Sequence, residues 1–169
     1  VDFGYSGIYF KPLVNAKAKF IDLDNDGLPE MIYAGSTSST SIGVAAVYVY
    51  YFDNFNGGLQ AYELELENEF PVLTGSSIAI GDIDNDQDYD LILAGSSPAF
   101  GRVTDVYLNE GINENGQLVM VKDQKIVVKI TGVTNGTLDL VDIDNDGDLD
   151  LVVSGDSFNG DILQLYRND

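Results

Sequence analysis

Short apolar runs alternate with acidic turns along the whole chain, and the same order recurs every sixty residues. The most regular runs are almost continuously apolar and end in Gly or Ser, at 31–36, 91–97 and 151–157. Apolar runs of this length, rich in β-branched residues and ended by small ones, predict strands buried on both faces. No stretch has the apolar spacing of an amphipathic helix. The pattern therefore predicts an all-β chain with an internal repeat.

Each buried run has neighbours that would complete a four-stranded antiparallel meander. An apolar stretch precedes it and another apolar segment follows it, and in the first unit a fourth segment at 59–70 alternates apolar and charged residues. Such alternation is typical of a half-exposed strand at a sheet edge. The preceding stretches are 16–22, 76–82 and 137–142, and the following segments are 44–54, 103–111 and 162–169.

Four-stranded meanders repeated around an axis form the blades of a β-propeller. The chain holds about three blade-equivalents, while propellers close with about four to eight blades. We therefore expect part of a larger propeller, or a ring that closes by assembly with another copy. The expected division is the last strand of a preceding blade within 1–14, blade repeats at 15–74 and 75–133, and an incomplete repeat at 134–169.

The acidic turns share one carboxylate spacing, D-x-D-x-D-x-x-x-[DE], placed directly before each buried run. Alternate carboxylates in a tight turn converge, and Ca²⁺ takes about six to eight oxygen ligands at flexible geometry. The carbonyl at the seventh position would add a backbone ligand, as in an EF-hand loop. The spacing thus predicts about three Ca²⁺ ions. The predicted ligands are Asp22, Asp24, Asp26, Glu30 and the Leu28 carbonyl; Asp82, Asp84, Asp86, Asp90 and the Asp88 carbonyl; and Asp142, Asp144, Asp146, Asp150 and the Asp148 carbonyl.

The sixth position of each turn needs a permissive backbone, and Gly27 and Gly147 provide one. Gln87 breaks this rule, so we expect more strain or weaker affinity in the second turn. Mg²⁺ fits less well, because it retains water and avoids all-protein sites. Solvated acidic turns without metal are the alternative. Three turns in register between apolar strands argue against it.

Two other calcium architectures fit the sequence poorly. An EF-hand has flanking helices and a Glu at the twelfth position, where this chain has Tyr33, Leu93 or Val153 inside predicted strands. Calcium-binding β-rolls need glycine-rich nonapeptides, which the chain lacks. The acidic turns are therefore predicted to belong to the blades themselves.

A formal net charge of −20 narrows the possible partners and chemistry. It argues against nucleic acid and anionic membranes, because phosphate contacts need a basic surface. Without Cys or His the chain has no thiol chemistry and lacks the commonest general base. No apolar run approaches the length of a membrane span, so we expect no membrane insertion.

The sequence resembles the FG-GAP/VCBS repeat of integrin-α-like calcium-binding β-propellers. The resemblance rests on the acidic turn, the apolar strand after it, Ala-Gly-Ser-Ser-Pro at 94–98, and Tyr-x-Asn at Tyr107–Asn109 and again at 166–168. Phe52-Asp53-Asn54 is expected to fill the Tyr-x-Asn position of the first unit. The resemblance implies that the turn joins the first two strands of a blade, that the same carboxylates bind calcium, and that the protein is extracellular or on the cell surface.

These observations predict a non-catalytic module in which calcium is a structural staple and which mediates adhesion or recognition of a protein or glycan ligand. One alternative is a structural subunit of an extracellular filament or surface assembly, with other copies of itself as partners. Another is an accessory domain of a carbohydrate-active enzyme. Five aromatic residues can form a recognition platform or simply pack between blades: Tyr48, Tyr50, Tyr51, Phe55 and Tyr62.

Overall fold

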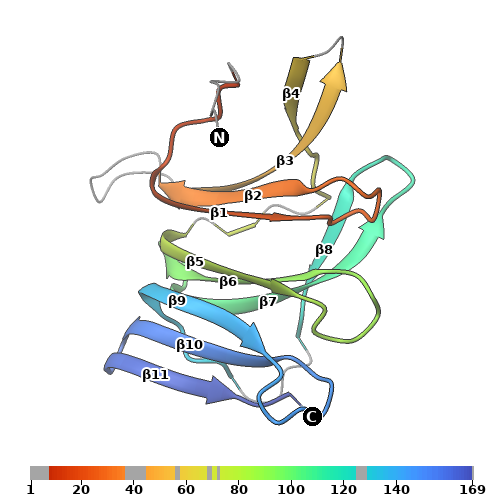
Figure 1. Cartoon of the computed structure of the whole chain (residues 1–169). Helices are drawn as coiled ribbons and strands as arrows, with labels where there is room; N and C mark the ends of the chain where they lie inside the picture. The colour runs from red at the N-terminus through yellow and green to blue at the C-terminus, as the bar shows by residue number, and fades with distance from the viewer. Residues whose placement is uncertain are drawn as a thin grey trace, which may run out of the picture.

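Strands are the only regular secondary structure among the residues that the structure describes. The computed structural model describes residues 8–36, 45–55, 58–67, 70–71, 73–124 and 129–168. These residues form eleven strands in three antiparallel sheets, stacked face to face from the first repeat to the third (Figure 1). Across the described ranges we find no helix long and apolar enough to cross a membrane.

Each sheet is an up-and-down meander of consecutive strands, and none of the three closes on itself. The first sheet contains β1 (Val14–Ile21), β2 (Glu30–Ser36), β3 (Ala45–Phe55) and β4 (Gly58–Glu63). The second contains β5 (Thr74–Gly81), β6 (Asp90–Ser97), β7 (Gly101–Ile112) and β8 (Leu118–Lys122). The third contains β9 (Thr134–Val141), β10 (Asp150–Ser157) and β11 (Gly160–Tyr166). The predicted all-β fold of blade-like antiparallel sheets is confirmed.

The continuous apolar runs of the sequence are strands that serve two cores at once. In β6, Leu93 packs into the core between the first and second sheets, whereas its neighbour Ile92 packs into the core between the second and third. Both side chains are almost fully buried. Because successive side chains of a strand point to opposite faces, a strand between two sheets needs apolar residues at every position.

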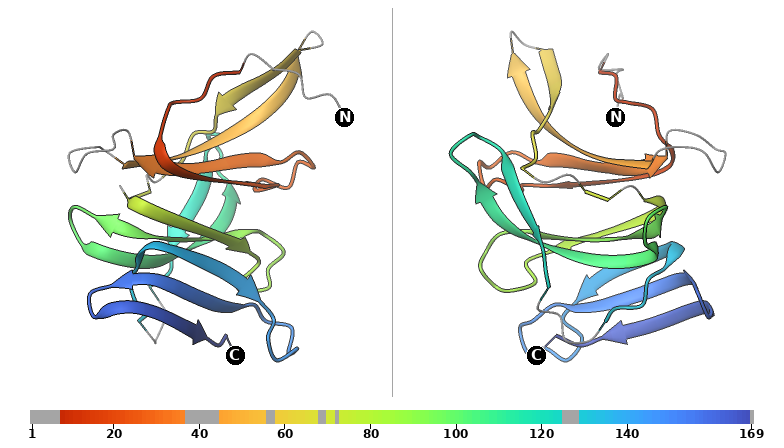
Figure 2. Two further views of the ribbon diagram at one scale, coloured as in Figure 1. Left: turned by 60° about the vertical axis from the view of Figure 1, so that its left-hand side comes forward. Right: turned by 180° about the vertical axis from the view of Figure 1, so that it is seen from behind.

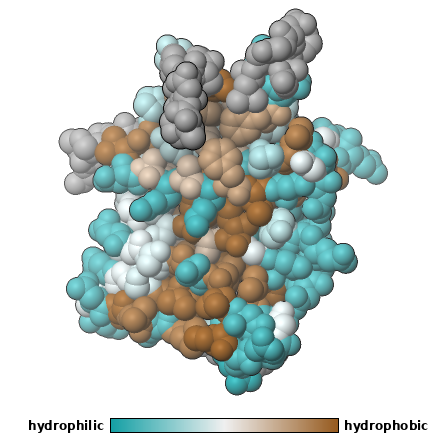
Figure 3. Space-filling model, in the orientation of Figure 1, coloured by the Kyte–Doolittle hydropathy of each residue, from teal (hydrophilic) through white to brown (hydrophobic). Residues whose placement is uncertain are grey.

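The first strands of the three sheets lie side by side, since β5 contacts both β1 and β9. The connections from first to second strand therefore emerge at the same end of the stack in all three sheets, as the views in Figures 1 and 2 agree. These connections are the acidic turns, and polar residues gather at that end of the surface in Figure 3. The fold thus brings the three acidic turns into a row.

The N-terminal segment differs from its prediction as a strand. In its described part, residues 8–13, there is no strand, and Val14 already belongs to β1; residues 1–7 lie outside the described residues. Pro12 has no N–H to donate to a sheet. The ring of Phe10 instead meets the ring of Tyr50 edge-on, with 5.1 Å between centroids. The segment therefore covers the outer face of the first sheet, and the division into units at 15, 75 and 134 stays a prediction.

The predicted edge strand at 59–70 is shorter than expected, because β4 ends at Glu63. The chain then crosses from the first sheet to the second. Leu66 forms a parallel bridge with Leu118 of β8, and the Glu67 N–H donates to the Leu118 carbonyl at 3.0 Å. Leu66 also packs against the core between these sheets. The segment after β4 thus ties the first two sheets together through the backbone.

Candidate metal centre

Three loops carry the acidic residues: loop 1 (22–30), loop 2 (82–90) and loop 3 (142–150). In each loop the first carboxylate folds the chain back by accepting the N–H of the sixth residue. The Oδ2 distances to that nitrogen are 2.9 Å for Asp22 and Gly27, 3.0 Å for Asp82 and Gln87, and 3.2 Å for Asp142 and Gly147. Each loop is therefore closed by its own first ligand candidate.

The closed loops need two left-handed residues, at the fourth and sixth positions. Asn occupies the fourth position in all three loops, and Asn tolerates this conformation well. Gly27 and Gly147 occupy the sixth position without steric penalty, but Gln87 adopts a φ of 80° there. A side chain in this region costs about 1 kcal/mol. Loop 2 thus contains the strain expected from its sequence, while its weaker affinity stays a prediction.

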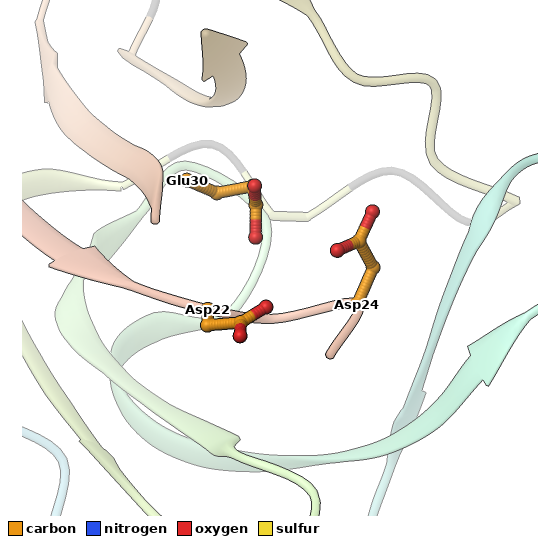
Figure 4. Close-up of side chains that lie close together, drawn as sticks. All are labelled: Asp22, Asp24 and Glu30. Atoms are coloured by element: carbon orange, nitrogen blue, oxygen red, sulfur yellow. The ribbon is translucent and has the colours of Figure 1, made fainter. Parts of the chain in front are cut away.

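Three carboxylates converge in each loop. In every group the closest oxygens, one from each residue, all lie within 4.8 Å of one another. Figure 4 shows the first group, in which the Asp22, Asp24 and Glu30 carboxylates turn toward a common space. The groups are Asp22, Asp24 and Glu30; Asp82, Asp84 and Asp86; and Asp142, Asp144 and Asp146. This spacing allows one cation to contact three carboxylates at once.

One oxygen in loop 1 tests whether a metal ion fits. The Oδ1 atom of Asp22 is buried and lacks a hydrogen-bond partner among the described residues. In loops 2 and 3 the equivalent oxygens of Asp82 and Asp142 each accept a backbone N–H at 3.1 Å. An unpaired buried carboxylate oxygen is unfavourable. A hard cation that takes oxygen ligands satisfies it, so the donor set fits Ca²⁺.

The ninth position of each loop is the most deeply buried. Glu30 is 1% exposed, and Asp90 and Asp150 are completely buried. One oxygen of each accepts the N–H of the second loop residue, at 2.7 Å for Leu23, 2.7 Å for Ile83 and 3.0 Å for Ile143. In Asp90 and Asp150 the other oxygen accepts a further backbone N–H. Asp90 and Asp150 therefore hold their loops in place. The longer Glu30 side chain does the same and also reaches the converging carboxylates of Asp22 and Asp24.

Burial and mutual repulsion favour the protonated forms of Glu30, Asp90 and Asp24. Burial raises the pKa of Glu30 to about 7, an effect that the Leu23 N–H reduces and the charges of Asp24 and neighbouring aspartates reinforce. Burial also raises the pKa of Asp90 to about 6, against the opposing effect of its two backbone N–H bonds. The pKa of Asp24 is raised in the same way. Without a cation, the loops therefore disfavour their own negative charge.

Metal-free protein is expected to melt about 5 °C higher at pH 5 than at pH 8. A carboxyl with a raised pKa binds its proton more tightly in the folded state. The resulting stability is fully present below the unfolded pKa values, 4.5 for Glu30 and 3.8 for Asp90, and is lost as the pH rises through about 6 to 7. Circular dichroism melts in calcium-free buffer measure the change.

Glu30→Gln is the control for this pH dependence, since it keeps the shape of the side chain and removes its titration. The variant should lose the part of the pH dependence that falls between pH 6 and pH 8. A melting temperature of the stripped wild type that stays flat or falls between pH 8 and pH 5 would contradict the raised pKa values.

Several predicted ligands lie outside the converging groups. The Oδ1 atom of Asp26 accepts the Leu28 N–H at 2.7 Å, and the Leu28 side chain is exposed. The side chains of Asp88 and Asp148 accept amide hydrogen bonds from Asn25 and Asn85 of the preceding loops. Backbone coordination at the seventh position therefore stays a prediction for all three loops.

Two asparagines that matter to the site were not among the predicted site residues. Asn109 and Asn168 each donate from Nδ2 to a carbonyl in the loop of the preceding sheet, Leu23 at 2.8 Å and Ile83 at 2.9 Å. The repeated Tyr-x-Asn motif was their only signal in the sequence. The motif could not predict which groups these asparagines bind, because the Leu23 and Ile83 carbonyls lie 86 and 85 residues away in the sequence.

The strand register also corrects the position of this motif in the first sheet. Tyr107 pairs with Leu91, and the equivalent pair in the first sheet is Tyr50 with Met31. Phe52, rather than Asn54, therefore takes the position of the motif's asparagine. The Phe52 ring stacks with Phe20 at a centroid distance of 6.1 Å and also meets Phe10. An aromatic contact replaces the polar one in this sheet.

Comparisons with known proteins bear on the fold and on the repeat. No curated protein matches the chain. A chain in the cryo-EM structure of RAG in complex with one melted RSS and one unmelted RSS is similar, with a TM-score of 0.52 and 13% identity. The match covers 86% of this protein but 42% of that chain, and at this identity it shows the fold alone. Residues 22–93, which include loops 1 and 2, match the FG-GAP-like repeat. The chain therefore carries an FG-GAP-like repeat, and the resemblance inferred from its sequence is confirmed over those residues.

Proposed function

We propose that each of the three loops binds one calcium ion and that these ions stabilise the stack of sheets. The observation that carries the proposal is the convergence of three carboxylates in every loop, with a buried, unpaired oxygen on Asp22 in the first. Asp22, Asp24 and Glu30 would hold the ion in loop 1. The equivalent groups would hold it in loops 2 and 3.

The chain supplies the shape of each site, and the ion supplies only compensating positive charge. The first aspartate closes the loop, and the buried ninth residue anchors the loop to the strand after it. Both interactions bring the carboxylates of the loop near one another, which reduces the ordering that ion binding requires without removing it. Extracellular calcium modules typically bind with Kd values of about 10⁻⁴–10⁻³ M.

Isothermal titration calorimetry tests the proposal through the number of ions bound. We expect three calcium ions per chain, and two after Asp24→Ala or Asp84→Ala, because each variant removes a converging carboxylate from one loop. Asp161→Asn is the control, since it also removes one negative charge but lies exposed on β11. Absence of calcium binding to the wild type, with no change in melting temperature, would overturn the proposal.

We further propose that the protein is an extracellular or cell-surface recognition module without catalysis of its own. Tyr51 and Tyr62 stack across β3 and β4 at a centroid distance of 5.3 Å, and they are 39% and 40% exposed. Such an exposed aromatic pair can contact a sugar ring or a protein side chain. Tyr50 is buried and packs against Phe10, so it is excluded from this surface.

A second candidate function is assembly with other copies, favoured by the outer faces of the stack. Leu163 of β11 is 76% exposed and Leu165 is 49% exposed, while Phe20 is 60% exposed at the other end of the stack. Figure 3, which views the stack from the side, shows a further apolar band that runs across the sheets. Large exposed apolar patches mark interaction sites. The molar mass in solution distinguishes an assembly subunit from a recognition module.

A further inference from the structure

A hydrogen-bonded path runs through all three loops and connects their buried carboxylates. It begins at Glu30, which accepts the Leu23 N–H at 2.7 Å. The Leu23 carbonyl accepts from Asn109 Nδ2 at 2.8 Å, and the Asn109 N–H donates to Asp90 Oδ1 at 2.9 Å. Loop 1 and loop 2 are thereby joined through one residue. The joining residue, Asn109, is 2% exposed.

The same path continues from loop 2 to loop 3. The other oxygen of Asp90 accepts the Ile83 N–H at 2.7 Å, and the Ile83 carbonyl accepts from Asn168 Nδ2 at 2.9 Å. The Asn168 N–H then donates to Asp150 Oδ1 at 2.9 Å. Two successive junctions therefore use the same atoms in the same order, although the residues that they join are far apart in sequence.

A second, exposed link parallels each buried one. Asn25 Nδ2 of loop 1 donates to Asp88 Oδ1 of loop 2 at 2.6 Å, and Asn85 of loop 2 donates in the same way to Asp148 of loop 3. Asn25 and Asn85 are the left-handed residues of their loops. Each of the first two loops is thus connected to the next loop by two hydrogen-bonded links, one buried and one exposed.

We infer that Asn109 and Asn168 are positioning residues that couple neighbouring calcium sites, so that an ion in one loop strengthens binding in the next. The inference rests on the proposed function. An ion that orders loop 1 fixes the Leu23 carbonyl, and through Asn109 this fixes the Asp90 carboxylate and the loop that it anchors. Because part of the ordering of loop 2 is then already complete, its own ion binds with a smaller entropic penalty. The coupling is reciprocal between the two loops.

The coupling can be measured at one site by NMR. The backbone amide of Gln87 reports on loop 2, because it donates to Asp82 within that loop. Its shift is followed through calcium titrations of the wild type, Asp24→Ala, Asn109→Ala and the double variant. We expect Asp24→Ala, which disables loop 1, to raise the calcium midpoint of loop 2 about fivefold. The same change should shift that midpoint much less once Asn109 is Ala, since only the exposed link through Asn25 then remains.

Asn109→Ala keeps the backbone N–H that donates to Asp90 and removes the link to the Leu23 carbonyl, together with the local bonds of the same side chain to the Tyr89 carbonyl and the Gly111 N–H. Asn113→Ala is the matched control, since it removes an amide that serves the turn between β7 and β8 and contacts Glu67, but bonds to none of the three acidic loops. It should leave the fivefold effect in place. If Asn109→Ala proves too unstable, Asn25→Ala cuts the exposed link and should reduce the coupling without emptying the core.

The outcomes separate the coupling from the proposed function itself. If the wild-type Gln87 amide does not respond to calcium, the proposed function is wrong. If it responds with the same midpoint whether loop 1 is intact or disabled, calcium binds but the coupling is overturned. A fivefold shift that persists in the Asn109→Ala background would also overturn the role assigned to this residue.

Discussion

Removal of calcium is expected to lower the melting temperature by about 10 °C or more at neutral pH. At a calcium concentration about twentyfold above Kd, each site adds about 1.8 kcal/mol to the free energy of unfolding. Three sites add about 5 kcal/mol, and each kcal/mol shifts the melting temperature of a domain of this size by about 2–4 °C. Differential scanning calorimetry of stripped and calcium-loaded protein measures the shift.

The loop variants are the internal control for this shift. Asp24→Ala and Asp84→Ala should each remove at least a third of the calcium effect, whereas the exposed Asp161→Asn should leave it intact. Magnesium at equal concentration should stabilise much less, because it gives up its water reluctantly. Equal melting temperatures with and without calcium would show that the loops are acidic turns that bind no stabilising calcium. The fold and the repeat would still stand.

Gly136→Ala is expected to lower the free energy of unfolding by about 3 kcal/mol. Gly136 lies in β9, where a Cβ atom would stand 1.8 Å from the Ser154 carbonyl oxygen and 2.7 Å from the Gly155 Cα. Both obstacles are backbone atoms, so no side-chain rotation relieves the clash. The Gly136 carbonyl also accepts from Ser77 Oγ at 2.7 Å, and the shift would disturb this contact between the second and third sheets.

Gly116→Ala separates this clash from the general penalty of replacing glycine. Gly116 has a φ of 78°, but nothing lies within 4 Å of its added Cβ. Its replacement should cost only about 1 kcal/mol, from backbone strain alone. Urea denaturation of the two variants gives both values. A loss at Gly136 no larger than the loss at Gly116 would contradict the close approach of β9 and β10.

The repeat pattern correctly predicted those features of the fold that depend on residues close together in the sequence. The apolar run at 91–97 is β6, because a strand between two sheets needs apolar side chains on both faces. The acidic spacing likewise predicted that three carboxylates converge, because neighbouring positions of one loop supply them. Strand pairing within a sheet and ligand spacing within a loop are both short-range properties, so one sequence is enough to predict them.

Features that depend on distant partners could not be predicted in the same way. Residues 8–13 were predicted to be part of a strand, but Phe10 packs against the first sheet without strand pairing. The strand register alone placed Phe52 in the motif's asparagine position. The role of Asn109 depends on the Leu23 carbonyl in another sheet. Each of these outcomes is decided by tertiary packing rather than by local preference.

The crossing of the chain from the first sheet to the second after β4 affects how the protein folds while it is being synthesised. Leu66 pairs with Leu118, which leaves the ribosome much later than the first sheet. The first sheet can therefore form its hairpins early. The segment 64–67 at its outer edge, however, has no pairing partner until β8 has been translated. During synthesis the segment 64–67 must therefore wait for the second sheet before it can pair. Until the second sheet has formed, Leu64 and Leu66 of this segment stay exposed on the incomplete chain, where chaperones can bind them.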